Sequence, residues 1–405
     1  MTATALAVTV VVAGACTGSG ADKNGGGTAS ACTSPGVTQE AVKVGVLYPD
    51  TGPFSSSFQG FRGGITARFA LENSRGGVHG REISTIWADD QASADSNRTE
   101  AQRLVEGEQV FSVVEASVAE GSSALYLEEQ GVPVTGVGPS VAWTQHRNMF
   151  TWSSLLSQGA VTSAWGQIAH NLGGTRAAVL AVVGVPSSQE LATTIAASMQ
   201  REGIQTVYQN LQLDPLLSMT TLARAIASSK ADIVTGVITP EIWAGLAPAL
   251  RAQGAQITVP LFPNGYDKET LRSGGSAYAG MYVAQVTAPF ELQLPAHQEF
   301  YAALTQYAPE VSTQQGQLAL NGWLAADLML RGLNAAGACP TRDGFIGALR
   351  SVLQYDAGGL VRPAANLTDY TLPSACLNLV RVDSSGQNFE VVGDAPICGQ
   401  VQPVS

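Results

Sequence analysis

The sequence predicts an α/β protein with two lobes, each built on a mostly parallel sheet. Short apolar, β-branched runs alternate with amphipathic helical patterns along most of the chain, which is typical of parallel strands joined by helices. The length of 405 residues exceeds one ordinary core and suits two domains. Hydrophobic residues make up 45% and charged residues 13%, so most of the chain is expected to fold.

The charge balance limits the possible partners. The formal net charge is -11 and the isoelectric point is near 4.8. No basic run is available to neutralise phosphates, so nucleic acid and anionic membrane surfaces are not expected partners.

The start of the chain resembles an export signal. Ala3 to Val12 is an apolar run too short to span a bilayer, and small residues lead from Ala13 to Cys16. This pattern is similar to a bacterial lipobox, which predicts a signal peptide over 1–16, a lipid-modified Cys16 and a cell-membrane anchor on the extracytoplasmic side. Ala13 stands where Leu is usual, and the absence of a preceding Lys or Arg leaves the start codon open. The alternative is an unlipidated signal peptide with Cys16 removed or free. The Gly/Ser/Thr-rich composition that follows predicts a flexible tether over 17–40.

The first structural unit extends from Val42 to Gln91. A buried strand ends at Pro49, a loop covers Asp50 to Gly60, and a helix with apolar residues on one face follows. Loops at the carboxyl ends of parallel strands bind ligands in open α/β sheets. The loop residues expected to contact a ligand are Ser55, Ser57 and Phe58. A second strand leads into Asp89 and Asp90, for which a solvated loop is the favoured interpretation.

This unit resembles the opening of the type I periplasmic solute-binding proteins, in particular the branched-chain amino acid-binding (leucine-binding protein-like) receptors of ABC transporters. The resemblance covers nearly the whole chain after Val42. It implies two Rossmann-like lobes with parallel sheets, joined by a hinge that the chain crosses near Trp152, Val286 and Leu353. Lobe 1 is then 41–152 plus 287–353, and lobe 2 is 153–286 plus 354–405. It also implies a small-molecule ligand captured between the lobes, ABC permease subunits as partners, and no cofactor.

The rest of the first lobe continues the alternation. Helices are predicted over Ser93–Glu106 and Gly121–Glu129, and strands over Val110–Val114 and up to Ser140. The resemblance places Ser117 where the amino acid binders keep a serine that meets the ligand carboxylate. It places Gly138 and Ser140 where they use a backbone group and a hydroxyl. An ordinary turn or helix cap is the alternative for each serine.

The second lobe follows the same rule with different strand ends. Strands are predicted over 176–183, 207–211, 233–238, 259–263 and 281–286, and helices over 158–172, 188–202, 220–228 and 242–253. Three further helical patterns, over 296–307, 316–335 and 342–352, fall in the part of the chain assigned to lobe 1. The tyrosines and glutamate of the amino acid binders have no equivalents here. Glu241 and Asp267 are candidates to neutralise an ammonium group, with a solvated loop as the alternative, and Tyr266 is a candidate for aromatic ligand contact.

Cysteine usage agrees with export. Without Cys16, four cysteines remain and allow three disulfide pairings. Two strand-like segments around 383–386 favour Cys376 with Cys398, which leaves Cys32 with Cys339. No Cys-x-x-Cys pair occurs and the four histidines are scattered, so no metal site is predicted.

Two other classes of function are alternatives to a solute-binding protein. An exported enzyme is disfavoured because no nucleophile elbow, Walker A loop or dinucleotide fingerprint occurs. A ligand sensor or accessory receptor of the same fold, without a transporter, remains the alternative to a solute-binding protein.

Overall fold

The computed structural model describes residues 32–52, 55–214, 216–311 and 315–403. The predicted signal peptide, the lipid-modified Cys16 and most of the predicted tether lie outside the described residues. Among the described helices, none combines the length and apolar character needed to cross a bilayer.

The first sheet is parallel throughout and has the strand order β2-β1-β3-β4-β5. Its strands are β1 (Ala41–Tyr48), β2 (Glu82–Asp89), β3 (Ser112–Ala116), β4 (Val134–Val137) and β5 (Met149–Phe150). Successive strand residues belong to different core clusters, as with Val46 and Leu47. Because side chains of a strand alternate between its faces, both faces of this sheet are buried.

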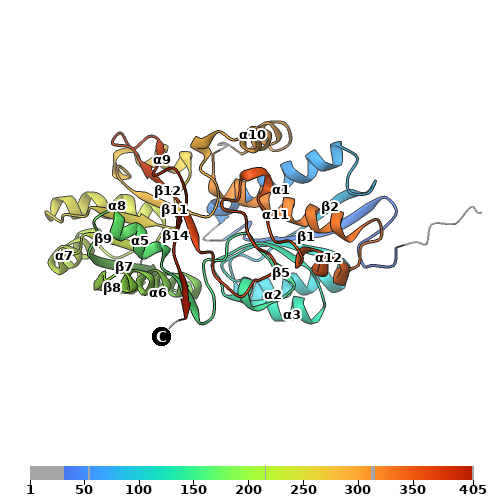
Figure 1. Cartoon of the computed structure of the whole chain (residues 1–405), viewed down its shortest axis with the longest axis horizontal. Helices are drawn as coiled ribbons and strands as arrows, with labels where there is room; N and C mark the ends of the chain where they lie inside the picture. The colour runs from blue at the N-terminus through green and yellow to red at the C-terminus, as the bar shows by residue number, and fades with distance from the viewer. Residues whose placement is uncertain (1–31, 53–54, 215, 312–314, 404–405) are drawn as a thin grey trace, which may run out of the picture. The chain divides into compact units, whose positions relative to one another are not determined.

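Helices from distant parts of the sequence cover the first sheet. α1 (Ser55–Ser74) packs against α11 (Gln317–Ala336) and α10 (Pro295–Tyr307), and α11 packs against α12 (Arg342–Leu349). The core cluster that contains Leu47 includes residues of α2 (Ala94–Gln102) and α3 (Ala124–Glu129). α1 and α11 lie side by side in Figure 1. A Cβ on Gly64 would lie 2.0 Å from the Ala319 carbonyl oxygen, so this close helix packing requires glycine.

The second sheet has the order β13-β12-β11-β10-β9-β7-β8. Its parallel strands are β7 (Arg176–Val182), β8 (Gln205–Leu213), β9 (Ile233–Val237), β10 (Val259–Phe262) and β11 (Tyr282–Gln285). β12 (Cys376–Val382) and β13 (Phe389–Val391) extend it in antiparallel fashion. α5 (Ala164–Asn171) packs on α6 (Pro186–Arg201), and α7 (Met219–Ser229) packs on α8 (Pro240–Ala252). The two-lobed α/β fold with parallel sheets is thereby confirmed.

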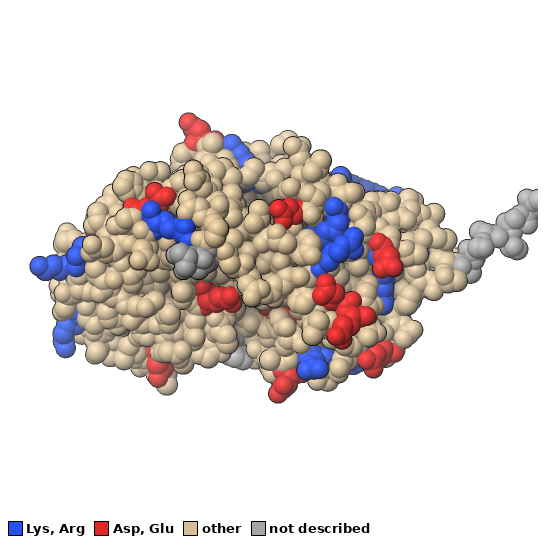
Figure 2. Space-filling view, turned by 60° about the horizontal axis from the view of Figure 1, so that its bottom comes forward, with Lys and Arg blue, Asp and Glu red and all other residues tan. Residues whose placement is uncertain are grey.

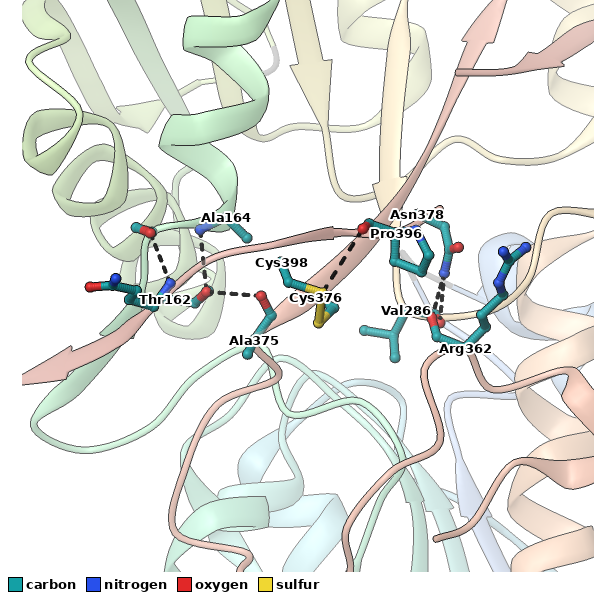
Figure 3. The surroundings of a disulfide bond; sticks show 11 residues. Thr162, Ala164, Val286, Arg362, Ala375, Cys376, Asn378, Pro396 and Cys398 are labelled. Carbon is teal, nitrogen blue, oxygen red and sulfur yellow. Dashed lines mark hydrogen bonds between the residues drawn. A yellow bond between two sulfur atoms is a disulfide. The ribbon is translucent and has the colours of Figure 1, made fainter. Parts of the chain in front are cut away.

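Three connecting segments join the elements of the two sheets. They are 151–159 after β5, 286–294 after β11, and 350–375 between α12 and β12. The Asn378 side-chain amide donates to the carbonyls of Val286 (3.1 Å) and Arg362 (2.7 Å), which ties the second segment to the third (Figure 3). The Ser374 N–H donates to the Ser154 carbonyl at 2.7 Å and ties the third to the first. The predicted crossings near Trp152, Val286 and Leu353 fall within these segments, and the exact lobe boundaries stay a prediction.

Both favoured disulfides are present in the structure. Cys376 and Cys398 face each other where β14 (Ile397–Cys398) pairs with β12 (Figure 3). Cys32 is bonded to Cys339, which follows α11 in the chain.

The structure corrects three local predictions. The tether does not extend to residue 40, because Cys32 is covalently held and Val37 is buried. The loop after β1 is shorter than predicted, since α1 already begins at Ser55. Residues 158–163 are not helical, because β6 (Ala160–Thr162) pairs with β15 (Val401–Pro403) near the end of the chain.

Candidate functional site

Asp89 organises the loop at the carboxyl end of β1. Its Oδ1 accepts hydrogen bonds from the backbone N–H groups of Asp50 (2.9 Å), Thr51 (3.2 Å) and Gln91 (3.0 Å). Burial acts to raise the pKa of Asp89, but these bonds and one from the Thr51 hydroxyl outweigh it and keep the pKa below its ordinary value. Asp89 is therefore a carboxylate that fixes loop geometry next to the strand ends.

A buried network of polar side chains lies at the same sheet edge. We call Asp90, Asn97, Glu115, Ser117 and Glu120 the acidic network; each is at most 1% exposed. The Asn97 side-chain amide donates to Asp90 Oδ2 at 3.0 Å and to Glu115 Oε1 at 2.8 Å. The Ser117 hydroxyl donates to Asp90 Oδ2. The expectation of a solvated Asp90 is therefore wrong, because hydrogen-bond donors from α2 and from the end of β3 enclose its carboxylate.

Glu120 reaches the strand end that carries Gly138. The Trp143 indole N–H donates to Glu120 Oε1 at 3.3 Å, and a Cβ on Gly138 would lie 2.0 Å from the same oxygen. Burial raises the pKa of Glu120 to about 8, and burial likewise raises the pKa of Glu115 well above its ordinary value. Glu120 therefore retains its proton at neutral pH, and Gly138 is required to make room for its side chain.

The acidic network has no cationic counterpart. The ion pairs found among the described residues include none of its three carboxyl groups. Within the described ranges, no group of three or more His, Cys, Asp or Glu side chains is arranged to hold a metal ion. Raised pKa values at Glu115 and Glu120, and hydrogen bonds to Asp90, are thus the means by which these buried carboxyl groups are accommodated.

The two predicted serines at this edge have different surroundings. Ser117 is buried, and its hydroxyl oxygen accepts the Ala119 N–H at 3.0 Å while its proton is given to Asp90. Its hydrogen bonds are therefore used within the protein. Ser140 is partly exposed, and its oxygen accepts the Ala142 N–H at 3.1 Å. Of the two hydroxyls, that of Ser140 is therefore the more accessible.

The residues predicted in the first loop belong to the first turn of α1. Ser55 donates its hydroxyl hydrogen to the Gly52 carbonyl at 3.0 Å, which closes the turn before the helix. The Phe58 ring is partly buried and packs against the core of the first sheet. Ser57 lies in the same helix, and its side chain is outside the described residues.

Tyr266 is enclosed rather than presented to a ligand. Its side chain is 1% exposed, and its ring stacks on Phe290 with centroids 5.2 Å apart and meets the edge of Phe389 at 4.7 Å. Its hydroxyl donates to Glu291 and accepts the Phe290 N–H at 2.7 Å. The expectation that Tyr266 offers aromatic surface to a ligand is therefore corrected, because residues from the second connecting segment and from β13 cover the ring.

The two acidic candidates of the second lobe also differ from each other. Asp267 caps α9 (Lys268–Gly274), where its Oδ1 accepts the N–H groups of Glu269 (2.7 Å) and Thr270 (3.3 Å). Burial raises the pKa of Asp267 above its ordinary value. Glu241 is exposed in the first turn of α8. Glu241 is thus the carboxylate of this pair whose oxygens are open to solvent.

The face of the molecule drawn in Figure 2 shows no basic area that would suit a polyanion. On the face drawn in Figure 2, acidic and basic side chains are sparse and intermixed among uncharged residues. No continuous basic area is visible there, which agrees with the acidic composition of the chain.

Comparisons with known proteins agree with this architecture. A family model described as periplasmic binding protein matches residues 41–387. A comparison with curated protein sequences found no match. A solved structure titled fatty acid ABC transporter substrate-binding protein, from Thermomonospora curvata, has 20% sequence identity, a TM-score of 0.71, and coverage of 89% of this chain and 94% of its own. A leucine-binding protein from Thermotoga maritima has 18% identity, a TM-score of 0.72, and coverage of 88% and 99%.

A third structure has the same level of similarity. It is an ABC-transporter solute-binding protein from Rhodopseudomonas palustris in complex with 3,4-dihydroxybenzoic acid, with 17% identity, a TM-score of 0.72, and coverage of 89% of this chain and 98% of its own. At these identities the structural neighbours establish a shared fold.

Proposed function

Because the chain belongs to the periplasmic binding protein family, we propose that it is an extracytoplasmic solute-binding lipoprotein that captures a small ligand between its two lobes and delivers it to an ABC importer. The ligand class is a small polar or amphipathic molecule, such as an amino acid-like compound, an amide or an organic acid. The chain has no assigned catalytic residue or cofactor in this function.

The observation that carries the proposal is the organised strand-end edge of the first sheet. Asp89 fixes the loop after β1, and the acidic network fixes the ends of β2 and β3. Preorganised groups reduce the entropy lost on binding, which favours recognition of a small ligand. Ser140 and the backbone around Gly138 then supply the hydrogen-bonding groups on the first lobe.

The second lobe supplies fewer candidate contacts. Glu241 is exposed at the amino end of α8, whereas Tyr266 and Asp267 have structural partners. We therefore assign first capture to the first lobe and a selective contact to Glu241. An ammonium or amide donor on the ligand is the group that an exposed carboxylate would accept.

A thermal-shift screen tests the proposed function. Amino acids, amides, amines and organic acids are added to the mature protein, and a ligand present at 100 times its Kd is expected to add about 2.7 kcal/mol of stability. Ser140→Trp should abolish the shift by filling the strand-end edge. Ser384→Trp is the matched control, because Ser384 lies exposed in the turn between β12 and β13. An unchanged shift in Ser140→Trp would show that the ligand binds elsewhere.

The lipid anchor is tested separately. Cys16→Ser removes the thiol that a lipoprotein needs for modification, so the protein should move from the membrane fraction to the soluble extracytoplasmic fraction. Membrane association that persists in Cys16→Ser would contradict the anchor without affecting the ligand-binding proposal.

A further inference from the structure

A cavity of about 280 Å³ lies where the three connecting segments meet. Its wall includes Trp152 from the first segment, Val286 from the second, and most of residues 363–375 from the third. We call it the crossing cavity. Its volume corresponds to about nine water molecules at roughly 30 Å³ each, near the lower end of small-molecule pockets. The loops after β1, β2 and β3 do not line it, so it is separate from the strand-end edge.

One wall of the crossing cavity carries the guanidinium of Arg350. Its central carbon lies 4.0 Å from the Phe150 ring centroid and 4.1 Å from that of Tyr370, so aromatic rings pack near it. Its N–H groups donate to three backbone carbonyls, those of Arg147 (2.9 Å), Leu367 (3.0 Å) and Met149 (2.5 Å). A guanidinium has five N–H donors, so these three bonds do not exhaust it.

Among the described residues, the positive charge of Arg350 has no carboxylate partner. The ion pairs found in the described part of the chain do not include it. Burial lowers the pKa of Arg350 to about 9, with Tyr370 acting against this shift and the charge of Arg147 adding to it, so Arg350 stays mainly charged at neutral pH. Asp369 also lines the cavity, but its carboxylate accepts the N–H (3.2 Å) and hydroxyl (2.7 Å) of Thr371 and is exposed.

Arg342 shows what a purely structural arginine looks like in this fold. It too donates to three backbone carbonyls, those of Phe111 (3.0 Å), Gln130 (3.1 Å) and Val110 (2.7 Å). Arg342 does not line the crossing cavity. Tying carbonyls together explains Arg342 completely, whereas Arg350 additionally lines a cavity.

We propose that the crossing cavity binds a small organic carboxylate. The carboxylate accepts the remaining N–H donors of Arg350, and its apolar body lies against the rings of Trp152 and Tyr370 and the side chain of Leu372 at the mouth. Leu372 is 45% exposed, as expected for an apolar residue at a cavity entrance. Hydrogen bonds between two charged groups are about twice as strong as neutral ones, so charge selects the ligand class. The site is a second one, independent of the ligand-binding edge.

One residue that lines the crossing cavity, Trp143, also contacts the acidic network of the first sheet. Trp143 lines the crossing cavity, and its indole N–H is the group that donates to Glu120 of the acidic network. The cavity is therefore lined by residues from all three connecting segments and by a residue that supports the strand-end edge.

Benzoate is the probe that tests this inference, with benzamide as its neutral counterpart. The indole N–H signal of Trp152 is followed by NMR in the folded mature protein while each compound is titrated. Benzoate is expected to shift this signal saturably and to bind about tenfold or more tightly than benzamide. Arg350→Gln should lower the affinity for benzoate by a similar factor, whereas Arg342→Gln should leave this affinity unchanged.

Crystals soaked with 4-iodobenzoate locate the probe directly, because iodine scatters anomalously. Iodine density in the crossing cavity supports the inference. Density only at the strand-end edge, equal binding of benzoate and benzamide, or unchanged benzoate affinity in Arg350→Gln would overturn it while leaving the proposed function standing. If Arg350→Gln does not fold, the iodine position and the benzamide comparison still decide the question.

Discussion

The strand ends of the two sheets use acidic side chains in opposite ways. At the first sheet, Asp90, Glu115 and Glu120 are buried and bonded to one another through Asn97 or held by Trp143. At the second sheet, Asp267 caps a helix and Glu241 is exposed to solvent. The first edge is thus built as a rigid support, whereas the second leaves one carboxylate free. A ligand would meet a preformed surface on one side and an adaptable charge on the other.

The largest expected effect is a dependence of stability on pH that originates at the first edge. The pKa of Glu120 is about 8 in the folded protein against an ordinary value of 4.5, and that of Glu115 is raised in the same direction. Between pH 4.5 and pH 8, Glu120 holds a proton in the folded state that it has released in the unfolded state. The free energy of unfolding therefore falls as the pH rises through this range.

The expected slope is up to about 1.4 kcal/mol per pH unit for each group. Urea unfolding at several pH values should show a flatter profile for Glu120→Gln than for the unmodified protein. Glu241→Gln, at the second edge, is the control and should leave the profile unchanged. If the free energy of unfolding has the same slope against pH in all three proteins, the buried carboxyl groups of the first edge do not cause the pH dependence.

The next largest effect is expected from Asn97→Ala. This change leaves the buried carboxyl groups of Asp90 and Glu115 without their shared amide donor, at a cost of about 3 kcal/mol. Asn264→Ala is the matched change at the second sheet, where one bond to the Ile238 carbonyl (2.9 Å) is lost at a cost of about 1 kcal/mol. Comparable losses in denaturant unfolding would mean that the first edge is no more constrained than the second.

A smaller effect is expected from Tyr266→Phe. The ring still fills its place between Phe290 and Phe389, but the buried Phe290 N–H and Glu291 lose a partner, which costs about 2 kcal/mol. The ranking of ligands in the thermal-shift panel should not change. A changed ranking would restore Tyr266 as a ligand-contacting residue.

The smallest effect is expected from the helix cap at the second edge. Asp267→Ala removes the acceptor of two N–H groups at the start of α9 and should cost about 1 kcal/mol. Asp267→Asn should recover most of this stability, since asparagine is an equally good cap. If the asparagine variant is as unstable as the alanine variant, the negative charge itself has a role that capping does not explain.

The fold could be predicted from the sequence because its signal is local and repeated. The predicted strand over 176–183 appears as Arg176–Val182, and the predicted helix over 316–335 appears as Gln317–Ala336. The predictions failed where contact with a segment distant in the sequence determines the local structure. Residues 160–162 pair with 401–403 near the end of the chain, so their own periodicity carries no information about that pairing.

The site was less predictable for the same reason. Asn97 and Glu115 come together only after α2 packs beside β3, and neither residue stands in a motif that would mark it. Tyr266 follows a glycine in what reads as an open loop, yet Phe290 and Phe389 bury it from elsewhere in the sequence. A signal for Glu120 was present in Gly138, because a glycine at a strand end can mark the close approach of another group.

The two disulfides determine which fragments stay covalently joined after a protease cuts the backbone once. Cys32 and Cys339 are 307 residues apart, so one backbone cut between them, in either of the first two connecting segments for example, leaves the two fragments covalently joined. The third connecting segment lies outside the two stretches of chain that the disulfides close, 32–339 and 376–398. A cut there, among its exposed residues, would leave β12 and β13 attached to the rest of the second sheet by hydrogen bonds and packing alone. This segment is therefore the one connection between the lobes that limited digestion could sever, with the loss visible on a non-reducing gel under denaturing conditions.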